Sequence, residues 1–156
     1  MRRKPIRFSV VATTLVLAGC HPSVPSAEPA IGPSGRSAGE LAAAYHVWAS
    51  QGIRSYAYTM EISCFCIHRG RYGVEVRDGR LASVRDAQTG VPSPESRVEW
   101  LLTVDQLFER MSQAVQIGTR VRAVYDARLG YPSEAEIGLL ADDSGTLYRI
   151  EGLRRL

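Results

Sequence analysis

The chain has 156 residues, of which 19 are basic and 16 acidic. This length allows one domain rather than two. Four basic residues lie within residues 1–19, which leaves 15 basic against 16 acidic residues in the remainder, a net charge near −1. The composition therefore gives no support to nucleic-acid binding. Lys4 is the only lysine, so a mature chain without these residues has neither a Schiff-base lysine nor a P-loop lysine.

Residues 1–19 have the pattern of a cleaved secretory signal. A basic segment precedes an uncharged apolar run at residues 8–17, which is too short to span a bilayer permanently. The run continues into Leu17-Ala18-Gly19-Cys20, which resembles the lipobox of bacterial prolipoproteins. We therefore predict that Cys20 is the lipid-attachment residue and that more than one acyl chain anchors it to a membrane. The alternative is an ordinary secretory signal with a coincidental cysteine.

The residue after Cys20 bears on which membrane would hold the protein. It is His21, not the aspartate that holds many lipoproteins at the inner membrane of diderm bacteria. We therefore expect the periplasmic face of the outer membrane, with the outer leaflet of the cytoplasmic membrane as the alternative. Residues 20–39 are rich in Pro, Ser, Ala and Gly and lack a hydrophobic period, which predicts a disordered tether before a domain at residues 40–156.

Two segments of the predicted domain have helical periodicity. The first is predicted to begin at Ser37, which has capping-box spacing to Glu40, and to end near Gly52. Its predicted buried face consists of Leu41, Ala44, Tyr45 and Trp48. The second is predicted to begin at the capping box of Thr103 and Gln106 and to end at Gly118. Its apolar positions are Val104, Leu107, Phe108, Met111 and Val115.

The remaining ordered segments predict six strands. The longest, residues 55–67, alternates with period 2, and its even-numbered face, from Tyr56 to Cys66, is predicted to face the core. Asp78-Gly79 predicts a type I′ hairpin turn. Strands are expected at residues 55–67, 72–77, 80–85, 120–126, 134–140 and 146–152, with a loop at 88–99. Short connections favour an antiparallel sheet, so we predict an α+β fold with the order αβββ-αβββ.

Cys64 and Cys66 are the strongest candidates for chemistry. An extracytoplasmic compartment is oxidising, which favours pairing. Two residues apart on a flat strand, their Cα atoms would be separated by about 6.6 Å, near the upper end of the disulfide range of about 4.4–6.8 Å. We interpret them as a structural pair facing inward, with a redox pair and a metal site that includes His68 as alternatives. One ion reaches both Cys64 and His68 only if the strand bends.

Other residue sets are better explained by structure. His21, His46 and His68 are predicted to lie in a tether, a helix and a strand end, without a hydrolase or zinc-protease motif around them. Residues 142–145 lack the third acid and the terminal glutamate of a calcium loop, so a turn is expected. Four tyrosines that could line a cleft are more simply assigned to core packing; they are Tyr56, Tyr58, Tyr125 and Tyr131.

Several of these motifs together resemble a bacterial family of secreted domains and lipoproteins of unknown function, family 6174 of the unknown-function series. The resemblance covers residues 45–153 and includes Cys64-Phe65-Cys66 and Gly130-Tyr131-Pro132. The matching segments also include Tyr56-Ala57-Tyr58, Val74 to Gly79, Thr103 to Phe108, and Val124 to Asp126. The chain departs from the family pattern at Gly138, where an aspartate is frequent. The resemblance implies no activity.

The sequence therefore predicts a lipid-anchored envelope protein that is not an enzyme and has no cofactor or metal. Its expected partners are the membrane, through the lipid on Cys20, and an envelope protein or small ligand. The alternative is a thiol–disulfide redox protein or sensor that uses Cys64 and Cys66. No residue set reaches the standard of a catalytic constellation.

Lipidation is tested by the Cys20→Ser substitution. The variant precursor should stay unprocessed by the lipoprotein signal peptidase, because the acyl acceptor is lost. Processing is measured by the mass of the membrane-associated protein. A variant that is still cut before residue 20 and retained in the membrane would contradict the assignment.

Overall fold

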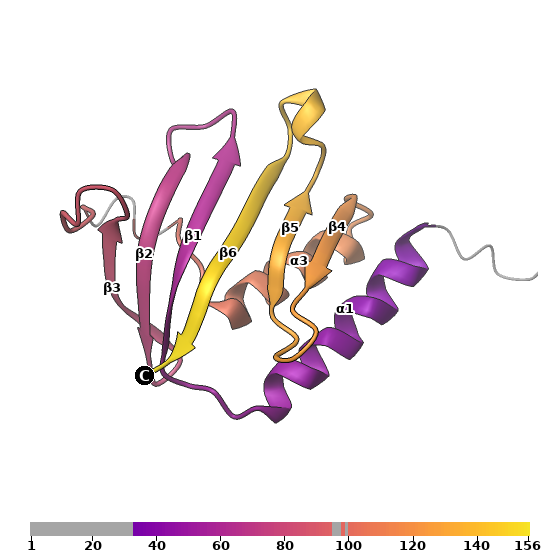
Figure 1. Ribbon diagram of the computed structural model, residues 1–156. Helices are drawn as coiled ribbons and strands as arrows, with labels where there is room; N and C mark the ends of the chain where they lie inside the picture. The colour runs from indigo at the N-terminus through magenta and orange to yellow at the C-terminus, as the bar shows by residue number, and fades with distance from the viewer. Residues whose placement is uncertain (1–32, 95–97, 99) are drawn as a thin grey trace, which may run out of the picture. The chain divides into compact units, whose positions relative to one another are not determined.

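The computed structural model describes residues 33–94, 98 and 100–156. The predicted signal, Cys20 and the first part of the predicted tether lie outside the described residues. Within the described part, six antiparallel strands form one sheet, and helices α1 and α3 cover one of its faces (Figure 1). The predicted α+β fold and its αβββ-αβββ order are confirmed. None of the helices described is both long and apolar enough to cross a bilayer.

The sheet joins the two halves of the chain through the strands at its centre. The strand order is β3-β2-β1-β6-β5-β4, and β1 pairs with β6 along most of its length. The elements are α1 (Pro33–Ser50), β1 (Tyr56–Cys64), β2 (Gly70–Arg77), β3 (Arg80–Asp86), α3 (Val104–Gln116), β4 (Val121–Tyr125), β5 (Pro132–Ile137), a 3-10 helix (Leu140–Asp142) and β6 (Thr146–Arg155). Each half is a meander of three strands, and the two meanders join through β1 and β6, the first and the last strand of the chain.

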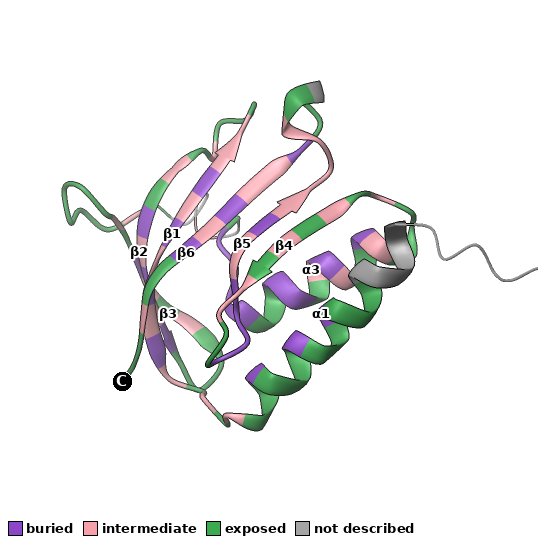
Figure 2. Ribbon diagram, turned by 45° about the vertical axis from the view of Figure 1, so that its right-hand side comes forward, coloured by how far each residue is buried: buried purple, intermediate pink, exposed green. Residues whose placement is uncertain are grey.

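Strand β1 provides the centre of the hydrophobic core. Its even-numbered side chains from Tyr56 to Ile62 are buried, while the odd-numbered ones are half-exposed on the other face (Figure 2). The predicted alternation is confirmed over this stretch. Val74 and Val76 of β2 and Ile150 of β6 extend the same buried layer. Its helical cover includes Leu107 and Met111 of α3, so apolar area is buried between sheet and helices.

Two tyrosine hydroxyls of β1 hold the start of α3. The hydroxyl of Tyr56 accepts the backbone N–H of Val104 at 3.0 Å, and that of Tyr58 donates to the carbonyl oxygen of Leu102. Burial raises the pKa of Tyr56 to about 12, so its hydroxyl is neutral at ordinary pH. A helix begins with N–H groups that lack partners within the helix. Tyr56 satisfies one of these groups across 48 residues of sequence.

The predicted capping box satisfies a second N–H of the same helix start. The Thr103 hydroxyl accepts the N–H of Gln106 at 3.2 Å, and the Gln106 side chain accepts the N–H of Thr103 at 2.8 Å. Thr103 is buried, so these bonds replace water that cannot reach the helix end. The predicted start of α3 is confirmed, although Val115 is only half-buried and Ala114 is buried beside Met111.

Helix α1 differs from its prediction at its start and on one face. It begins at Pro33 rather than Ser37, so residues 33–39 of the predicted tether are helical. Proline is favoured in a first helical turn because its fixed φ is already helical and it needs no N–H partner there. The predicted burial of Tyr45 is wrong: 46% of it is exposed, although its ring edge meets Phe108 at 5.2 Å between centroids. Leu41, Ala44 and Trp48 are buried as predicted.

The Gly130-Tyr131-Pro132 segment brings the second meander against α1. Gly130 has φ +80°, and a Cβ there would lie 2.6 Å from the carbonyl oxygen of Ala44. Glycine is therefore required both by the conformation and by the close approach to the helix. Tyr131 then packs edge-on against Trp48 with centroids 6.4 Å apart. Pro132 is the first residue of β5, a position that tolerates the missing N–H.

The remaining boundaries follow from local geometry. Asp78 and Gly79 have φ of 50° and 79°, which confirms the predicted hairpin turn. Strand β5 ends at Ile137, three residues before the predicted end, and a 3-10 helix begins at Leu140. That helix and Asp143, at φ 54°, form the turn expected at residues 142–145. Val98 is helical within the predicted loop.

The sheet face opposite the helices carries a ladder of ion pairs. Arg149 of β6 lies 3.1 Å from Glu134 of β5 and 3.7 Å from Glu61 of β1. Two further pairs extend the ladder across the sheet: Arg122 of β4 with Glu136 of β5, and Arg71 of β2 with Glu151 of β6. Exposed pairs of this kind contribute little to stability, because solvent screens them. Their main effect is to keep this face, hereafter the open face, polar.

Candidate functional site

The connection between β1 and β2 is a turn closed by a disulfide, hereafter the disulfide turn (residues 64–69). Strand β1 ends at Cys64 and β2 begins at Gly70, which pairs with Ile62. The chain therefore has to reverse within this segment. The bond joins Cys64 and Cys66, whose Cα atoms lie 5.2 Å apart. This separation is shorter than the distance of about 6.6 Å on a flat strand, because the chain bends after Cys64.

The predicted orientation of the cysteine pair is wrong for Cys66. Cys64 is half-buried and packs against the core, whereas Cys66 is exposed. The period-2 alternation ends with the strand, so it does not place side chains within the turn. The predicted strand to residue 67 is likewise wrong, since residues 65–68 are bends and turns. The bond thus joins a residue packed against the core to an exposed one.

Two apolar side chains project from the disulfide turn. Phe65 is 81% exposed and Ile67 is 83% exposed. The sequence placed both on the second face of a strand and gave no sign of this exposure. Large apolar side chains gathered at one point of a surface mark interaction sites more often than single scattered ones. They give the turn an apolar tip on a chain segment held by a covalent bond.

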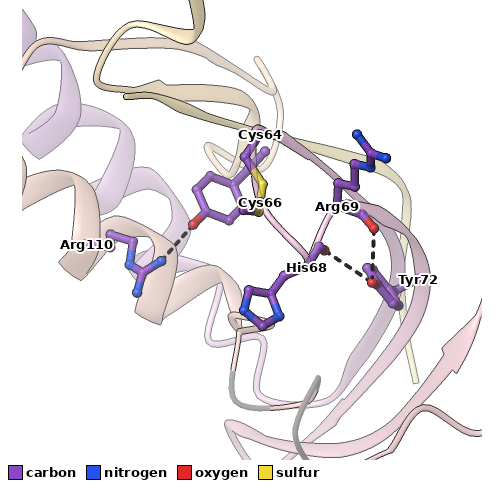
Figure 3. The surroundings of a disulfide bond; sticks show 7 residues. Cys64, Cys66, His68, Arg69, Tyr72 and Arg110 are labelled. Atoms are coloured by element: carbon purple, nitrogen blue, oxygen red, sulfur yellow. Dashed lines mark hydrogen bonds between the residues drawn. A yellow bond between two sulfur atoms is a disulfide. The ribbon is translucent and has the colours of Figure 1, made fainter. Parts of the chain in front are cut away.

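The base of the turn is packed rather than open. The His68 imidazole stacks on the Trp100 indole, with centroids 4.1 Å apart and planes at 17°. The Tyr72 hydroxyl donates toward the carbonyl oxygens of His68 at 3.2 Å and Arg69 at 3.5 Å (Figure 3). The Nδ1 atom of His68 is buried and has no hydrogen-bond partner among the described residues. These contacts hold the backbone of the turn beneath its exposed tip.

The predicted metal alternative lacks a ligand cluster. Among the described residues, no three His, Cys, Asp or Glu side chains come together as metal ligands would. Both sulfurs of the turn are bonded to each other, and in Figure 3 the His68 ring points away from them. His46 lies exposed on α1, far along the chain from the turn, and His21 lies outside the described residues.

An open hollow of about 480 Å³ adjoins the turn on the side of Cys64. Arg69 and Arg71 line it together with Glu61 and Gln88. Arg71 is paired with Glu151. Nearby guanidinium groups favour the thiolate form of a cysteine. The two arginines are therefore an argument for the redox alternative.

The tyrosines assigned to core packing lie largely in the core. Tyr56, Tyr58 and Tyr131 are buried, and Tyr125 is half-buried. Burial raises the pKa of each of these tyrosines, to about 12 for Tyr125. A raised pKa keeps the phenol neutral and so opposes a role as a base. The prediction of core packing is therefore confirmed for the three buried rings.

Fold and site together define an α+β domain with a polar open face and a disulfide turn at one end of its β1–β2 hairpin. The chain belongs to the Family of unknown function (DUF6174), whose model matches residues 40–155. That span includes the disulfide turn and all six strands described above. The family predicted from the sequence is thereby confirmed, and the match carries no information on secretion or lipidation. No curated protein and no solved structure is significantly similar to the chain.

The structural role of the bond is tested by replacing both cysteines, Cys64→Ser with Cys66→Ser. The bond closes a loop of a few residues, so the chain-entropy model gives it no more than about 2 kcal/mol of stability. Urea unfolding followed by tryptophan fluorescence should show a loss below that value, with an unchanged m-value. A variant that no longer folds, or loses more than about 4 kcal/mol, would contradict the description of the turn as peripheral to the core.

Proposed function

We propose that this protein is a non-enzymatic binding module of a bacterial cell envelope that contacts a partner protein through the disulfide turn. The observation that carries this proposal is the exposure of Phe65 and Ile67, at 81% and 83%, on a covalently closed turn. Burying such side chains in a partner's cleft would gain apolar area of the kind that dominates interface hot spots.

The disulfide supports binding by limiting the freedom of the turn. Ordering a flexible loop on association costs free energy, and a segment already held in place avoids part of that cost. Here the bond between Cys64 and Cys66 and the stack of His68 on Trp100 hold the turn from both sides. The tip residues Phe65 and Ile67 lie outside the hydrophobic core.

The proposed location rests on residues 1–20 and on the cysteine chemistry. We propose that Cys20 carries the lipid anchor and that the domain faces the periplasm, from the outer membrane or from the cytoplasmic membrane. A disulfide between two cysteines is what an oxidising compartment produces. A tether between Cys20 and α1 would let the turn reach a partner away from the bilayer surface.

A thiol–disulfide redox role is the second candidate function. The exposure of Cys66 favours it, as do Arg69 and Arg71 beside the hollow next to Cys64. The two functions predict different reduction potentials, measured by equilibration with glutathione buffers. A structural bridge should have a potential below about −300 mV, whereas an oxidoreductase pair lies above about −270 mV.

The binding role is tested by photo-crosslinking in the native envelope. Benzoylphenylalanine in place of Phe65 should form one discrete covalent product with a protein, because the side chain would sit inside the partner's cleft. Ile117 is the matched control, since it is also apolar and 80% exposed but lies at the end of α3. The same photoreactive residue at 117 should give no such product.

A second substitution connects the product to the apolar tip. Ile67→Ser should weaken the crosslink from position 65, since it removes half of the exposed apolar pair without touching the disulfide. Equal products from positions 65 and 117 would contradict a specific surface. Transfer of the crosslink to lipid would assign the turn to the membrane instead of a protein.

A further inference from the structure

A hollow of about 300 Å³ lies on the open face, away from the disulfide turn. It spans strands β3, β2, β1 and β6. The strand register places Arg85, Gly73 and Thr59 side by side in one cross-strand row. The next row contains Ser83, Glu75, Ala57 and Arg154. Small residues thus form the floor, and long charged side chains stand around it.

Gly73 keeps the floor low although the fold does not require glycine there. It lies within β2 without a positive φ, and a Cβ added to it would meet only the carbonyl oxygen of Arg85, at 3.9 Å. Glycine inside a strand is destabilising relative to alanine. A strand glycine without a conformational reason often marks a place where a ligand approaches the backbone.

Gly152 opens the same hollow for a different reason. It has φ +62° and lies where β6 shifts register against residues 57–59 of β1. A bulge of this kind favours glycine by its conformation alone. Gly73 differs from Gly152 in that neither its φ nor a close neighbour requires glycine.

The rim of the hollow carries cations that glutamates do not neutralise. The guanidinium of Arg154 makes no hydrogen bond or ion pair with another described residue, and that of Arg85 donates only to the carbonyl oxygen of Gly90, at 3.4 Å. Glu75 is already engaged by Arg77 at 2.5 Å and by the Ser83 hydroxyl at 3.4 Å. Elsewhere on the open face, arginines are paired in the ion-pair ladder. The hollow therefore offers two guanidinium groups to an incoming anion.

We infer that this hollow binds a small ligand that bears an oxyanion, a carboxylate or a phosphate, held by Arg85 and Arg154 over Gly73. Guanidinium groups match both oxyanions with paired, charge-assisted hydrogen bonds. The Thr59 side chain lies on the floor between them and can donate one more. A volume of about 300 Å³ is at the small end of ligand pockets, which fits a compact ligand rather than a polymer.

The inference is tested by titrating the isotope-labelled protein with inorganic phosphate or with succinate at constant ionic strength. Backbone amide shifts in an NMR spectrum should saturate and should cluster at Thr59, Gly73 and Gly152. Saturation by phosphate alone, by succinate alone or by both identifies the oxyanion. Unsaturated or scattered shifts with both probes would overturn the inference.

Substitutions separate the hollow from general surface charge. Arg154→Gln should weaken the binding of the probe that saturates at least tenfold, because a charge-assisted hydrogen bond is lost. Arg122→Gln removes the same charge from the open face at β4, outside the hollow, and should leave binding unchanged. Equal weakening by both variants would overturn the inference.

Gly73→Val should change stability and binding in opposite directions. Valine favours a strand and would fill the hollow, so the melting temperature should stay the same or rise while binding is lost. A folded Gly73→Val protein that binds the probe as well as the wild type would contradict the site. If this variant does not fold, the Arg154→Gln and Arg122→Gln pair decides the question.

Discussion

The bonds from two tyrosine hydroxyls of β1 to the start of α3 are the constraint on which this structure depends. Tyr56 accepts the N–H of Val104, and Tyr58 donates to the carbonyl oxygen of Leu102. Both hydroxyls lie in the core, where an unpaired N–H or carbonyl group costs free energy that water cannot offset. The hydrogen bonds therefore fix where the helix of the second half begins over the central strand of the first.

The same strand positions the two candidate sites at different places on the sheet. One face of β1 packs against the helices, and the other, with Thr59, forms part of the floor of the hollow. Its end at Cys64 begins the disulfide turn. A rigid central strand thus holds an apolar tip and a cationic hollow in fixed places. The proposed partner protein and the inferred oxyanion would therefore bind to separate surfaces of one rigid sheet.

Local signals predicted the parts of the fold that local geometry determines. The alternation through Ile62, the hairpin at Asp78-Gly79 and the capping box at Thr103 each depend on residues a few positions apart. The end of β1 depends instead on pairing with β2, which begins at Gly70. Extending the period-2 alternation beyond Cys64 therefore assigned Cys66 to the wrong face. The hollow around Gly73 depends on neighbours in three other strands, which no single stretch of sequence displays.

The most direct test of the central constraint is the unfolding free energy of Tyr56→Phe. The variant keeps the ring but leaves the buried N–H of Val104 without an acceptor, so a loss of about 1–3 kcal/mol is expected in urea unfolding. Tyr148→Phe is the matched control, because its hydroxyl accepts from Arg110, whose guanidinium is partly exposed and can be rehydrated. A clearly larger loss for Tyr56→Phe than for Tyr148→Phe supports the account, and equal or smaller losses would contradict it.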